Sequence, residues 1–508
     1  MNRNPKIQEL ESLACHLEGL KKQGKRIVHS HGVFDLLHLG HIRHFEEAKR
    51  MGDILVVTIT PDEYVNKGPN RPAFPHDVRA EVIASLGMVD FVAVNRWPMS
   101  VETIKLLKPD VYVKGQDYKI AEKDVTGGIV PEAEAIRSVG GEIRFTDDIT
   151  FSSSNILNRH MSSLAPEVNE FLEQFRFLHS SGELIEEIET LRSLKVLVIG
   201  EAILDEYVYC NALGKSSKEP IIAMQYLSRE MYAGGALAIA NHVADFCDQV
   251  QLITYIGGDN PQENFIRERL KRNIRPTLIV KSNSPTIVKR RYVEKYLVTK
   301  LLEVYEMNDL PLTEAEDRVL CAQLEKALSD ADVVIAADFG HGLISPRAIE
   351  LLSTRSRFLA VNTQINAGNL GYHAISRYQR ADYVCIHEGE IRLDQRSRTG
   401  DLDKLIQELS RRMHCPTVMC TRGKIGTSLY REGAGVSCCP AFALRVVDRI
   451  GAGDAVLALT SLCAARNLPA DVIGFVGNLA GAQSVAFVGN SASIGRISLL
   501  KSIESLLK

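Results

Sequence analysis

The sequence predicts an α/β protein with two domains of parallel sheet joined by a helical connector, and three observations support this prediction. The chain has 508 residues, which is too long for one ordinary hydrophobic core and suggests roughly two to four domains. Short apolar runs of β type alternate with helical patterns along most of the chain, which is typical of βαβ units. A charged helical stretch interrupts this alternation once.

The first α/β series is expected within residues 1–160. Residues 1–26 show a polar amphipathic pattern, which predicts a helix. The helical pattern HIRHFEEAKRMG follows the first of the predicted strands. These strands are RIVHSHGVF (26–34), ILVVTIT (54–60), DFVAV (90–94) and VYVKG (111–115).

The connector is expected at residues 161–193. From Pro166 to Ser193 the sequence is charged, periodic and free of β-branched runs, which predicts two helices with a break at Ser180–Gly182. Two amphipathic helices without a sheet need an apolar partner, so we expect this connector to mediate a homodimer. The second α/β series occupies residues 194–508.

Composition excludes several classes of protein. The chain is 45% hydrophobic and 24% charged with a formal net charge of −3, so neither nucleic acid nor a membrane surface is expected as its main partner. No apolar run approaches the ~20 residues that span a bilayer, and the first residues lack the apolar core of a secretion signal. The ten cysteines include no CxxC spacing, which favours reduced thiols in a cytoplasmic protein.

The stretch HGVFDLLHLGH, residues 31–41, places His38 and His41 where an apolar strand turns into a helix. Imidazoles in the first turn of a helix can donate hydrogen bonds to phosphate, and Gly40 allows a nucleotide to approach the backbone. As metal ligands the two histidines would need further partners at suitable spacing. A pair of ordinary surface or core histidines is the alternative.

The residues around this pair resemble the signature of the cytidylyltransferase-like nucleotidyltransferases, in the order G-x-F-D-x-x-H-x-G-H. Four further segments resemble later parts of that family: KGPNRPAFPHDVRAEVIASL, VDFVAV, YVKGQDY and FSSSNIL. The resemblance implies a Rossmann-like domain. The matching signature residues are Gly32, Phe34, Asp35, His38, Gly40 and His41.

In that family a substrate phosphate attacks the α-phosphate of a nucleoside triphosphate and releases pyrophosphate, without a covalent intermediate. Such a transfer needs positioned cations and hydrogen-bond donors. By resemblance, His38 and His41 stabilise the triphosphate. The same resemblance assigns Lys67 and Arg71 to substrate or phosphate, and Lys114, Ser153 and Ser154 to the nucleotide.

One departure concerns His31, where relatives often carry Asn, Asp or Tyr. It leaves open which base the nucleotide carries.

A second site is predicted in VVDRIGAGDAVLALTSL, residues 446–462. Gly451, Ala452 and Gly453 precede a helical apolar run, so backbone N–H groups at a helix N-terminus can form an anion cradle. Asp454 beside this cradle is a candidate base for a hydroxyl that attacks a γ-phosphate. The alternative is an aspartate that caps the helix after a glycine turn.

This motif resembles the hallmark of the ribokinase-like (PfkB) sugar kinases, and AGGALAIANHVADF, YIGGDN, DFGHG, HEGE and TRGKIG follow that family's order. The resemblance implies a ribokinase-like fold with Asp454 as the base and Gly451 to Gly453 as the cradle. It places Asp205 and Asn241 at the sugar, with Gly234 and Gly235 in the first glycine motif. It places Thr421 and Gly423 near the nucleotide, while Glu390 acts indirectly through Mg²⁺.

Taken together, the two halves resemble the bifunctional heptose kinase and heptose-phosphate nucleotidyltransferase family, which supplies a lipopolysaccharide precursor. The domain order is reversed here, VNTQINAGN (361–369) replaces an Asp-Pro-Lys segment, and Glu303 and Tyr305 stand where Arg and Asp are expected. The resemblance implies an ADP- or CDP-activated heptose made from small-molecule sugar phosphates, with ATP, or CTP at the first site. Two alternatives are a transferase for another phosphate such as glycerol 3-phosphate, with a separate kinase substrate, and a silent kinase-like half that acts as a sensor or dimerisation scaffold.

Overall fold

The computed structural model describes residues 4–65, 71–119, 127–146, 164–296, 298–443 and 445–508. The chain forms two compact units, Met1–Ala165 with Ile497–Lys508, and Pro166–Arg496. This division differs from the predicted domains in two places. The two connector helices belong to the second unit, and the last helix, α17 (Arg496–Leu507), is grouped from Ile497 onward with the first.

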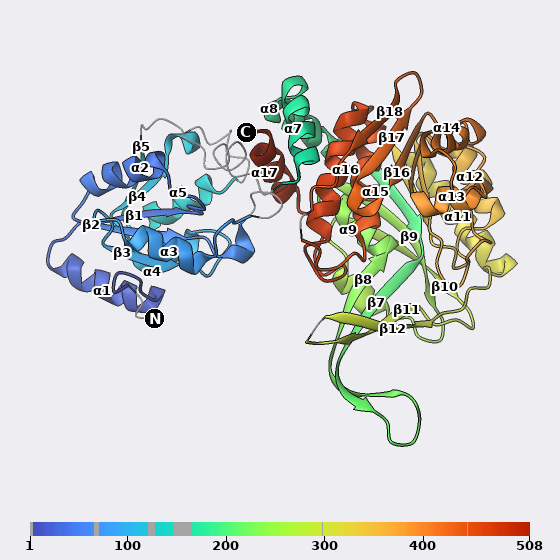
Figure 1. Cartoon of the computed structure of the whole chain (residues 1–508), viewed down its shortest axis with the longest axis horizontal. Helices are drawn as coiled ribbons and strands as arrows, with labels where there is room; N and C mark the ends of the chain where they lie inside the picture. The colour runs from blue at the N-terminus through green and yellow to red at the C-terminus, as the bar shows by residue number, and fades with distance from the viewer. Residues whose placement is uncertain (1–3, 66–70, 120–126, 147–163, 297, 444) are drawn as a thin grey trace. The chain divides into compact units, whose positions relative to one another are not determined.

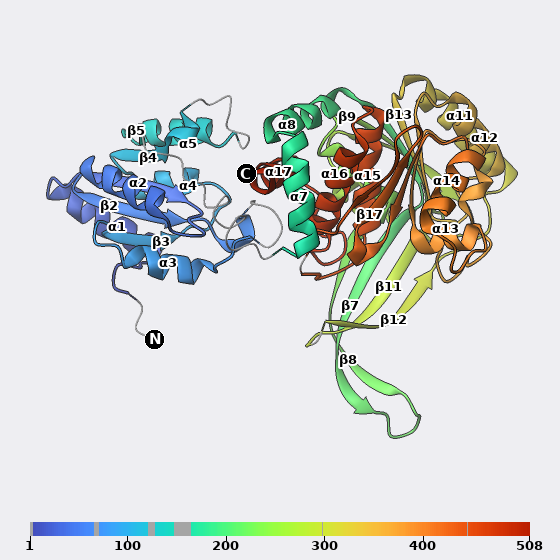
Figure 2. The same ribbon diagram turned by 45° about the horizontal axis from the view of Figure 1, so that its top comes forward.

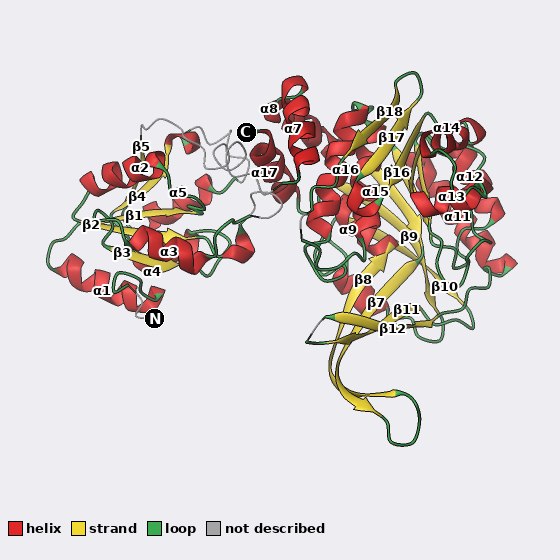
Figure 3. Ribbon diagram, in the orientation of Figure 1, coloured by secondary structure: helices red, strands yellow, loops and turns green. Residues whose placement is uncertain are grey.

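The first unit contains a five-stranded parallel sheet in the order β3-β2-β1-β4-β5 (Figure 3). The four strands predicted from the sequence are confirmed as β1 to β4. The strand order reverses between β1 and β4, and in open parallel sheets such a reversal leaves a crevice at the carboxyl ends of the strands. The strands are β1 (Ile27–Gly32), β2 (Ile54–Ile59), β3 (Phe91–Val94), β4 (Val111–Gly115) and β5 (Glu142–Thr146).

Helices cover both faces of this sheet. Helices α2 and α3 share one apolar core with β1, β2 and β4, whereas α1, α4 and α5 pack on the opposite face. The amphipathic helix predicted at the N-terminal end is α1, which buries Leu10, Leu13 and Leu17. The helices are α1 (Leu10–Lys22), α2 (Leu39–Arg50), α3 (His76–Ala84), α4 (Val101–Leu107) and α5 (Ile129–Ser138).

The second unit is built on a nine-stranded sheet in the order β10-β9-β6-β13-β14-β15-β16-β17-β18. Neighbours are parallel except for the pairs made by β17 and β18, and the order reverses between β6 and β13. The strands are β6 (Lys195–Gly200), β9 (Gln249–Gly257), β10 (Ile274–Lys281), β13 (Val333–Asp338), β14 (Leu359–Thr363), β15 (Tyr383–His387), β16 (Thr417–Thr421), β17 (Thr427–Arg431) and β18 (Gly435–Cys439).

Two groups of helices sandwich this sheet (Figures 1 and 3). One face carries α9 (Ala236–Ala244), α15 (Ala452–Ala465) and α16 (Ala470–Ser484). The other carries α11 (Glu314–Asp330), α12 (Pro346–Arg355), α13 (Glu388–Asp394) and α14 (Leu402–Arg412). The short helix α10 (Glu263–Arg269) connects β9 to β10.

A four-stranded sheet, called here the small sheet, has the order β12-β11-β7-β8. Its strands are β7 (Ala202–Lys215), β8 (Ile222–Gly235), β11 (Ile287–Glu294) and β12 (Thr299–Glu306). Because β7 begins directly after β6, the small sheet starts at the carboxyl edge of the large one. Strand β11 pairs with β7 only as far as Cys210, and beyond it β7 and β8 continue as a two-stranded ribbon (Figures 1 and 2).

The two helices predicted for the connector are present as α7 (Pro166–Leu178) and α8 (Ser181–Thr190), and Ser180 caps the second of them. Helix α7 packs on the second unit, where the Phe175 ring stacks on Phe475 at a centroid distance of 4.5 Å. The apolar face of α7 is therefore covered within the chain. It needs no partner from a second copy of the chain, so this face gives no support to the predicted dimer contact.

Among the described residues no helix is long and apolar enough to cross a membrane. Of the ten cysteines, only Cys15 and Cys438 are exposed.

Candidate active sites

The first candidate site lies in the loop between β1 and α2, at the point where the order of the five-stranded sheet reverses. Gly32 ends β1, and a Cβ there would lie 2.9 Å from the ring of Phe34. Phe34 itself adopts a left-handed backbone conformation with φ of 50°, which turns the chain sharply toward the helix. Glycine at position 32 thus makes room for the turn that presents the following residues.

Asp35 is buried and holds a neighbouring loop. One carboxylate oxygen accepts the N–H groups of Ala73 at 2.7 Å and Phe74 at 3.1 Å. The other oxygen lies 3.3 Å from the guanidinium of Arg71. The structure therefore brings two of the predicted site residues, Asp35 and Arg71, together, and it pairs them with each other.

His38 and His41 stack at the start of α2, with ring centroids 4.0 Å apart. His38 is the N-cap residue, and its Nδ1 accepts the N–H of Gly40 at 3.1 Å. In the neutral ring the proton must then reside on Nε2, which makes that atom a hydrogen-bond donor. This is the polarity that a phosphate oxygen requires.

Lys114, at the carboxyl end of β4, forms a buried ion pair with Glu132 of α5 at 2.9 Å. Burial works to lower the pKa of Lys114, but the neighbouring Tyr112 and Glu132 outweigh it and raise the pKa. The ammonium also lies 5.1 Å from the centroid of the Tyr118 ring. Lys114 therefore stays charged beside the reversal point, with its charge balanced by Glu132.

The side chain of His31, on β1, is buried. Its two ring nitrogens lie 2.8 Å from Thr58 Oγ1 and 3.2 Å from Thr60 Oγ1, and His29 shares the Thr58 hydroxyl at 2.7 Å. Burial lowers the pKa of both histidines to about 3. His31, where the sequence departs from the family pattern, thus belongs to a neutral hydrogen-bond network that joins β1 to β2 and to Thr60, the residue after β2.

Arg79 is a site residue that the sequence reasoning missed. Its guanidinium is buried in α3 and donates to the carbonyls of Val33, Thr60 and Phe74 and to the carboxylate of Asp62. It thereby joins the loops that follow β1 and β2. An arginine within the apolar pattern VRAEVIA was the available signal. Three predicted residues, Lys67, Ser153 and Ser154, lie outside the described part of the chain.

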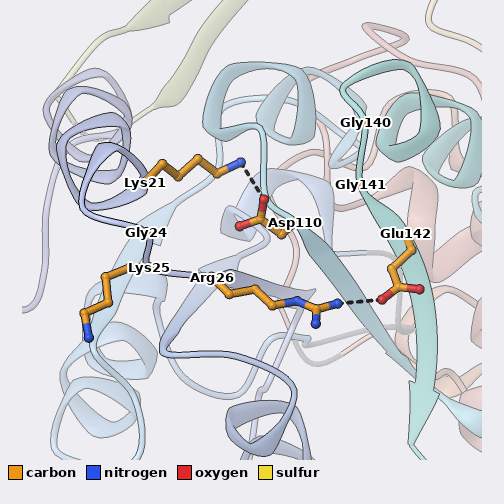
Figure 4. A pocket seen from close by; sticks show the side chains of 8 residues that line it. All are labelled: Lys21, Gly24, Lys25, Arg26, Asp110, Gly140, Gly141 and Glu142. Carbon is orange, nitrogen blue, oxygen red and sulfur yellow. Dashed lines mark hydrogen bonds and ion pairs between the residues drawn. The ribbon is translucent and has the colours of Figure 1, made fainter.

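A pocket of about 540 Å³ lies at the opposite edge of the same sheet, around the amino ends of β1, β4 and β5 (Figure 4). Lys21 pairs there with Asp110 at 3.0 Å, and Arg26 pairs with Glu142 at 2.7 Å. Because these cations are already neutralised, we interpret the pocket as an ion-pair cluster that joins the strand ends.

The second candidate site lies at the start of α15. Gly451 is the N-cap residue with φ of 83°, a conformation that favours glycine. A Cβ there would lie 2.1 Å from Oδ1 of Asn490. Glycine at this position therefore allows both the turn and the close approach of the Asn490 side chain.

The backbone of this turn presents N–H groups at the end of the helix. The N–H of Ala452 donates to the carbonyl of Arg449 at 3.4 Å. The N–H groups of Gly453 and Asp454 follow in the first turn, where a helix offers no carbonyl of its own to accept them. The N–H groups left for an anion at this turn are therefore those of Gly453 and Asp454, which differs from the predicted set Gly451 to Gly453 because Gly451 is the N-cap and the N–H of Ala452 already has an acceptor.

Asp454 is the third residue of α15, and no capping hydrogen bond from a side chain is present at this helix end. The capping alternative is therefore wrong. Within the described residues the Asp454 carboxylate makes no hydrogen bond or ion pair. Burial and the negative charge of Asp205 raise the pKa of Asp454 to about 7, against the positive charge of Lys289. A carboxylate with this pKa is suited to general-base chemistry near neutral pH.

Asp205 lies on β7 and faces the same site. Its carboxylate bonds Arg291 at 2.5 Å and accepts the side-chain N–H of Asn490 at 3.2 Å. A Cβ at Gly234 would lie 2.0 Å from the Asp205 carboxylate, so glycine is required beside it. Gly235 follows as the N-cap of α9 with φ of 57°. Asn490, which sequence reasoning missed, thus links Asp205 to the turn before α15.

The departures Glu303 and Tyr305 complete this cluster. Glu303 bonds the Arg291 guanidinium at 2.5 Å and accepts the Tyr305 hydroxyl at 2.7 Å. Lys289 lies two residues before Arg291 on β11, buried 5.3 Å from the centroid of the Tyr305 ring. Two cations of the small sheet therefore face the two aspartates of the site.

Three other predicted residues lie apart from this cluster. Asn241 uses its amide to bind the carbonyl of Arg269 and the N–H of Lys271, so the structure joins it to the loop before β10 rather than to Asp205. Thr421 ends β16, and Gly423, with φ of 56°, begins the turn that follows.

Glu390 accepts the N–H groups of Ile365 and His387, each at 2.9 Å, and burial raises its pKa. It thereby ties the 361–369 segment to the start of α13. In the same segment the amides of Asn366 and Asn369 both donate to the carbonyl of Phe339 at 3.1 Å. The altered segment 361–369 (VNTQINAGN) thus holds the DFGHG loop, residues 338–342, through these two hydrogen bonds.

Comparison with known proteins matches each half of the chain to a protein family. The model of the pfkB family of carbohydrate kinases matches residues 193–494, and the cytidylyltransferase-like model matches residues 30–159. The chain belongs to the pfkB family of carbohydrate kinases. It carries a nucleotidyltransferase-like domain in front of its ribokinase-like fold.

The curated relatives match only the N-terminal part of the chain. The "Bifunctional protein HldE" of a Nitratiruptor species is 37% identical over 159 residues, which is 31% of this chain and 32% of that protein. The protein of the same name from Aliarcobacter butzleri is 42% identical over 139 residues, or 27% and 28%. The match thus spans about a third of the length of these relatives.

Among solved structures, the potassium complex of phosphofructokinase-2 from Escherichia coli has a TM-score of 0.51 at 16% identity, and the match covers 62% of this chain and 100% of that one. A point mutant of the same enzyme gives 0.51 at 15% identity, with the same coverage. At this identity the likeness concerns the fold alone.

Proposed function

We propose that this chain is a bifunctional sugar-activating enzyme. Its pfkB domain phosphorylates a sugar or sugar phosphate with ATP, and its cytidylyltransferase-like domain transfers a nucleotidyl group to a sugar phosphate and releases pyrophosphate. The observation that carries the kinase half is Asp454, whose carboxylate has no partner among the described residues. Its pKa is about 7, and it lies beside a helix N-terminus and Asp205.

In the proposed kinase step, Asp205 accepts a hydrogen bond from the acceptor sugar while Asp454 removes the proton of the attacking hydroxyl. The new bond joins the sugar oxygen to the γ-phosphorus, and ADP leaves with the electron pair of the broken bond. The N–H groups at the start of α15 stabilise the transferred phosphoryl group. Lys289 is suited to an acceptor that already carries a phosphate, whereas Arg291 is already paired with Asp205 and Glu303.

In the proposed transferase step the nucleophile is a phosphate oxygen, which is already anionic and needs no base. Donors from His38 and His41 stabilise charge on the triphosphate, and pyrophosphate is the leaving group. Because Asp35 is neutralised by Arg71 and by backbone N–H groups, it serves this site by holding the loop.

The relatives named HldE support a heptose as the sugar, so we infer an ADP- or CDP-heptose for surface polysaccharide synthesis. Mg²⁺ accompanies the nucleoside triphosphates in this proposal. Within the described residues no group of three or more His, Cys, Asp or Glu could hold a metal ion by itself. Both carboxylate oxygens of Glu390 already accept backbone N–H groups. We therefore infer that Glu390 acts on Mg²⁺ indirectly, through water.

The test is a two-channel assay of the purified chain. Heptoses, heptose phosphates and glycerol 3-phosphate are offered with ATP or CTP, while ADP and pyrophosphate release are read separately. We expect both channels to respond to heptose substrates. Pyrophosphate release with glycerol 3-phosphate alone would favour the second transferase candidate, and a protein without ADP release would contradict the kinase half.

A further inference from the structure

Asp448, three residues before Gly451, is a buried carboxylate bound from several directions. It accepts the N–H of Ile450 at 3.1 Å, the N–H of Gly489 at 3.0 Å and the hydroxyl of Tyr207 at 2.6 Å. The ammonium of Lys300 completes the set with an ion pair. The donors come from the turn before α15, the segment after α16 and two strands of the small sheet.

The charge of Asp448 depends on these donors. Burial works to raise its pKa, but the hydrogen bonds from Lys300 and Tyr207 outweigh burial and keep the pKa below its usual value. A buried carboxylate left without a cation is strongly destabilising. Asp448 is 4% exposed, whereas the Lys300 side chain is 35% exposed, so the cation reaches the buried anion from the protein surface.

The contacts around Asp448 lead directly into the kinase site. The Ile450 N–H bond fixes the turn that precedes Gly451. A Cβ at Gly489 would lie 3.0 Å from the Tyr207 hydroxyl, so that segment fits closely against β7. The next residue, Asn490, contacts Asp205 and the Gly451 position. Any displacement at Asp448 is thus transmitted to both sides of the cradle.

We propose that Lys300 is a positioning residue whose ammonium acts as a tethered cation on Asp448 and thereby couples the small sheet to the turn that presents Gly451 and Asp454. The inference rests on the proposed kinase function for its consequence in catalysis. Lys300 lies on β12, an edge strand, so the ion pair requires β12 to lie beside the turn that precedes α15.

The first experiment removes the ammonium with Lys300→Met and compares it with Lys295→Met, an exposed lysine near the same hairpin turn. A misplacement of about 1 Å in an active site can cost about 100-fold, so we expect kcat of Lys300→Met to fall by about that factor with little change in the KM for ATP. Lys295→Met should match the wild type.

Ammonium ion supplies the group that Lys300→Met lacks. It should restore the turnover of that variant in a saturable manner, whereas tetramethylammonium, which is too large to reach a buried carboxylate, should not. Lys300→Arg should retain most activity. Unchanged turnover in Lys300→Met, or a loss that ammonium does not reverse, would overturn the proposal.

Hydrogen exchange at residues 448–454 and 489–490 tests the coupling without any turnover. Exchange should be faster in Lys300→Met, return toward wild type with ammonium, and stay unchanged in Lys295→Met. If the wild type phosphorylates no acceptor, the proposed kinase function fails while this result still supports the tethered cation. Unchanged exchange overturns the tethered cation alone. Lys300→Gln replaces Lys300→Met if the latter does not fold.

Discussion

The two candidate sites differ in the partners that surround their aspartates. Both sites lie at the carboxyl edge of a parallel sheet and use the N-terminus of a helix. In the first, Asp35 is saturated by Ala73, Phe74 and Arg71. In the second, Asp454 has no partner within the described residues, and its pKa is raised to about 7.

This difference follows from the nucleophile that each site is proposed to activate. A phosphate oxygen is anionic at neutral pH, so the first site needs donors and cations around it. A sugar hydroxyl must lose a proton, so the second site needs a base of suitable pKa. The comparison teaches that the role of an aspartate beside a glycine turn is determined by its hydrogen-bond and ion-pair partners. The sequence motif alone does not determine it.

The largest effect is expected for Asp454→Asn, which keeps size and removes basicity. General-base contributions are about 10²–10⁴-fold, so phosphorylation should fall by that factor while ATP binding changes little. Turnover and nucleotide affinity measured on the same pair of proteins check this. A kinase rate like that of the wild type would remove Asp454 from the mechanism, and pyrophosphate release serves as the internal control.

Next in size is the loss of a phosphate donor in the first site. His38→Ala or His41→Ala should cost roughly 3 kcal/mol of transition-state stabilisation, by analogy with the deletion of an oxyanion donor. Pyrophosphate release should fall by more than about 100-fold, and ADP release should continue. Full transferase activity in either variant would contradict the assignment of this motif.

Much of this arrangement can be predicted from the sequence. The alternation of apolar runs predicts β1 to β4, and the glycines of GAGD predict the cradle, because these features depend on local pattern and backbone geometry. Asn490 and Lys300 could not be predicted, since their partners Asp205 and Asp448 are far away in the chain and are set by tertiary packing. Asn241 shows the opposite error. The sequence predicts it as a sugar-binding residue, but its side-chain amide is hydrogen-bonded to backbone groups of the loop before β10.

The saturation of Asp35 predicts a structural rather than a catalytic phenotype. Asp35→Ala leaves two N–H groups and a guanidinium without their acceptor, which should destabilise the first unit by on the order of 2 kcal/mol. Asp35→Asn keeps the oxygen that accepts both N–H groups and should lose less. Thermal melts of both variants test the ranking. Equal stability with abolished pyrophosphate release in Asp35→Asn would instead make Asp35 part of the chemistry.

The pH dependence of the two activities should separate them. Asp454 must be ionised to act, so with a pKa of about 7 kinase turnover should rise about tenfold between about pH 6 and pH 8. The transferase has no such base and should lack this rise. Rate profiles of both channels on one preparation test the contrast. A kinase profile that is flat over this range would mean that another group accepts the proton.

The last effect concerns the pH dependence of stability and follows from the same carboxylate. Because the pKa of Asp454 is raised on folding to about 7, its contribution to stability is present in full at low pH and is lost as the pH rises toward 7. Each unit of pKa shift is worth about 1.4 kcal/mol, and partial exposure reduces the total to on the order of 2 kcal/mol. Asp454→Asn lacks this titration, so it should melt a few degrees above the wild type at about pH 8 and level with it near pH 4. Asp403→Asn, an exposed aspartate in the first turn of α14, should show no such trend. An Asp454→Asn variant that is less stable than the wild type at the higher pH would show that the carboxylate supports the fold, and the contrast with Asp35 would then disappear.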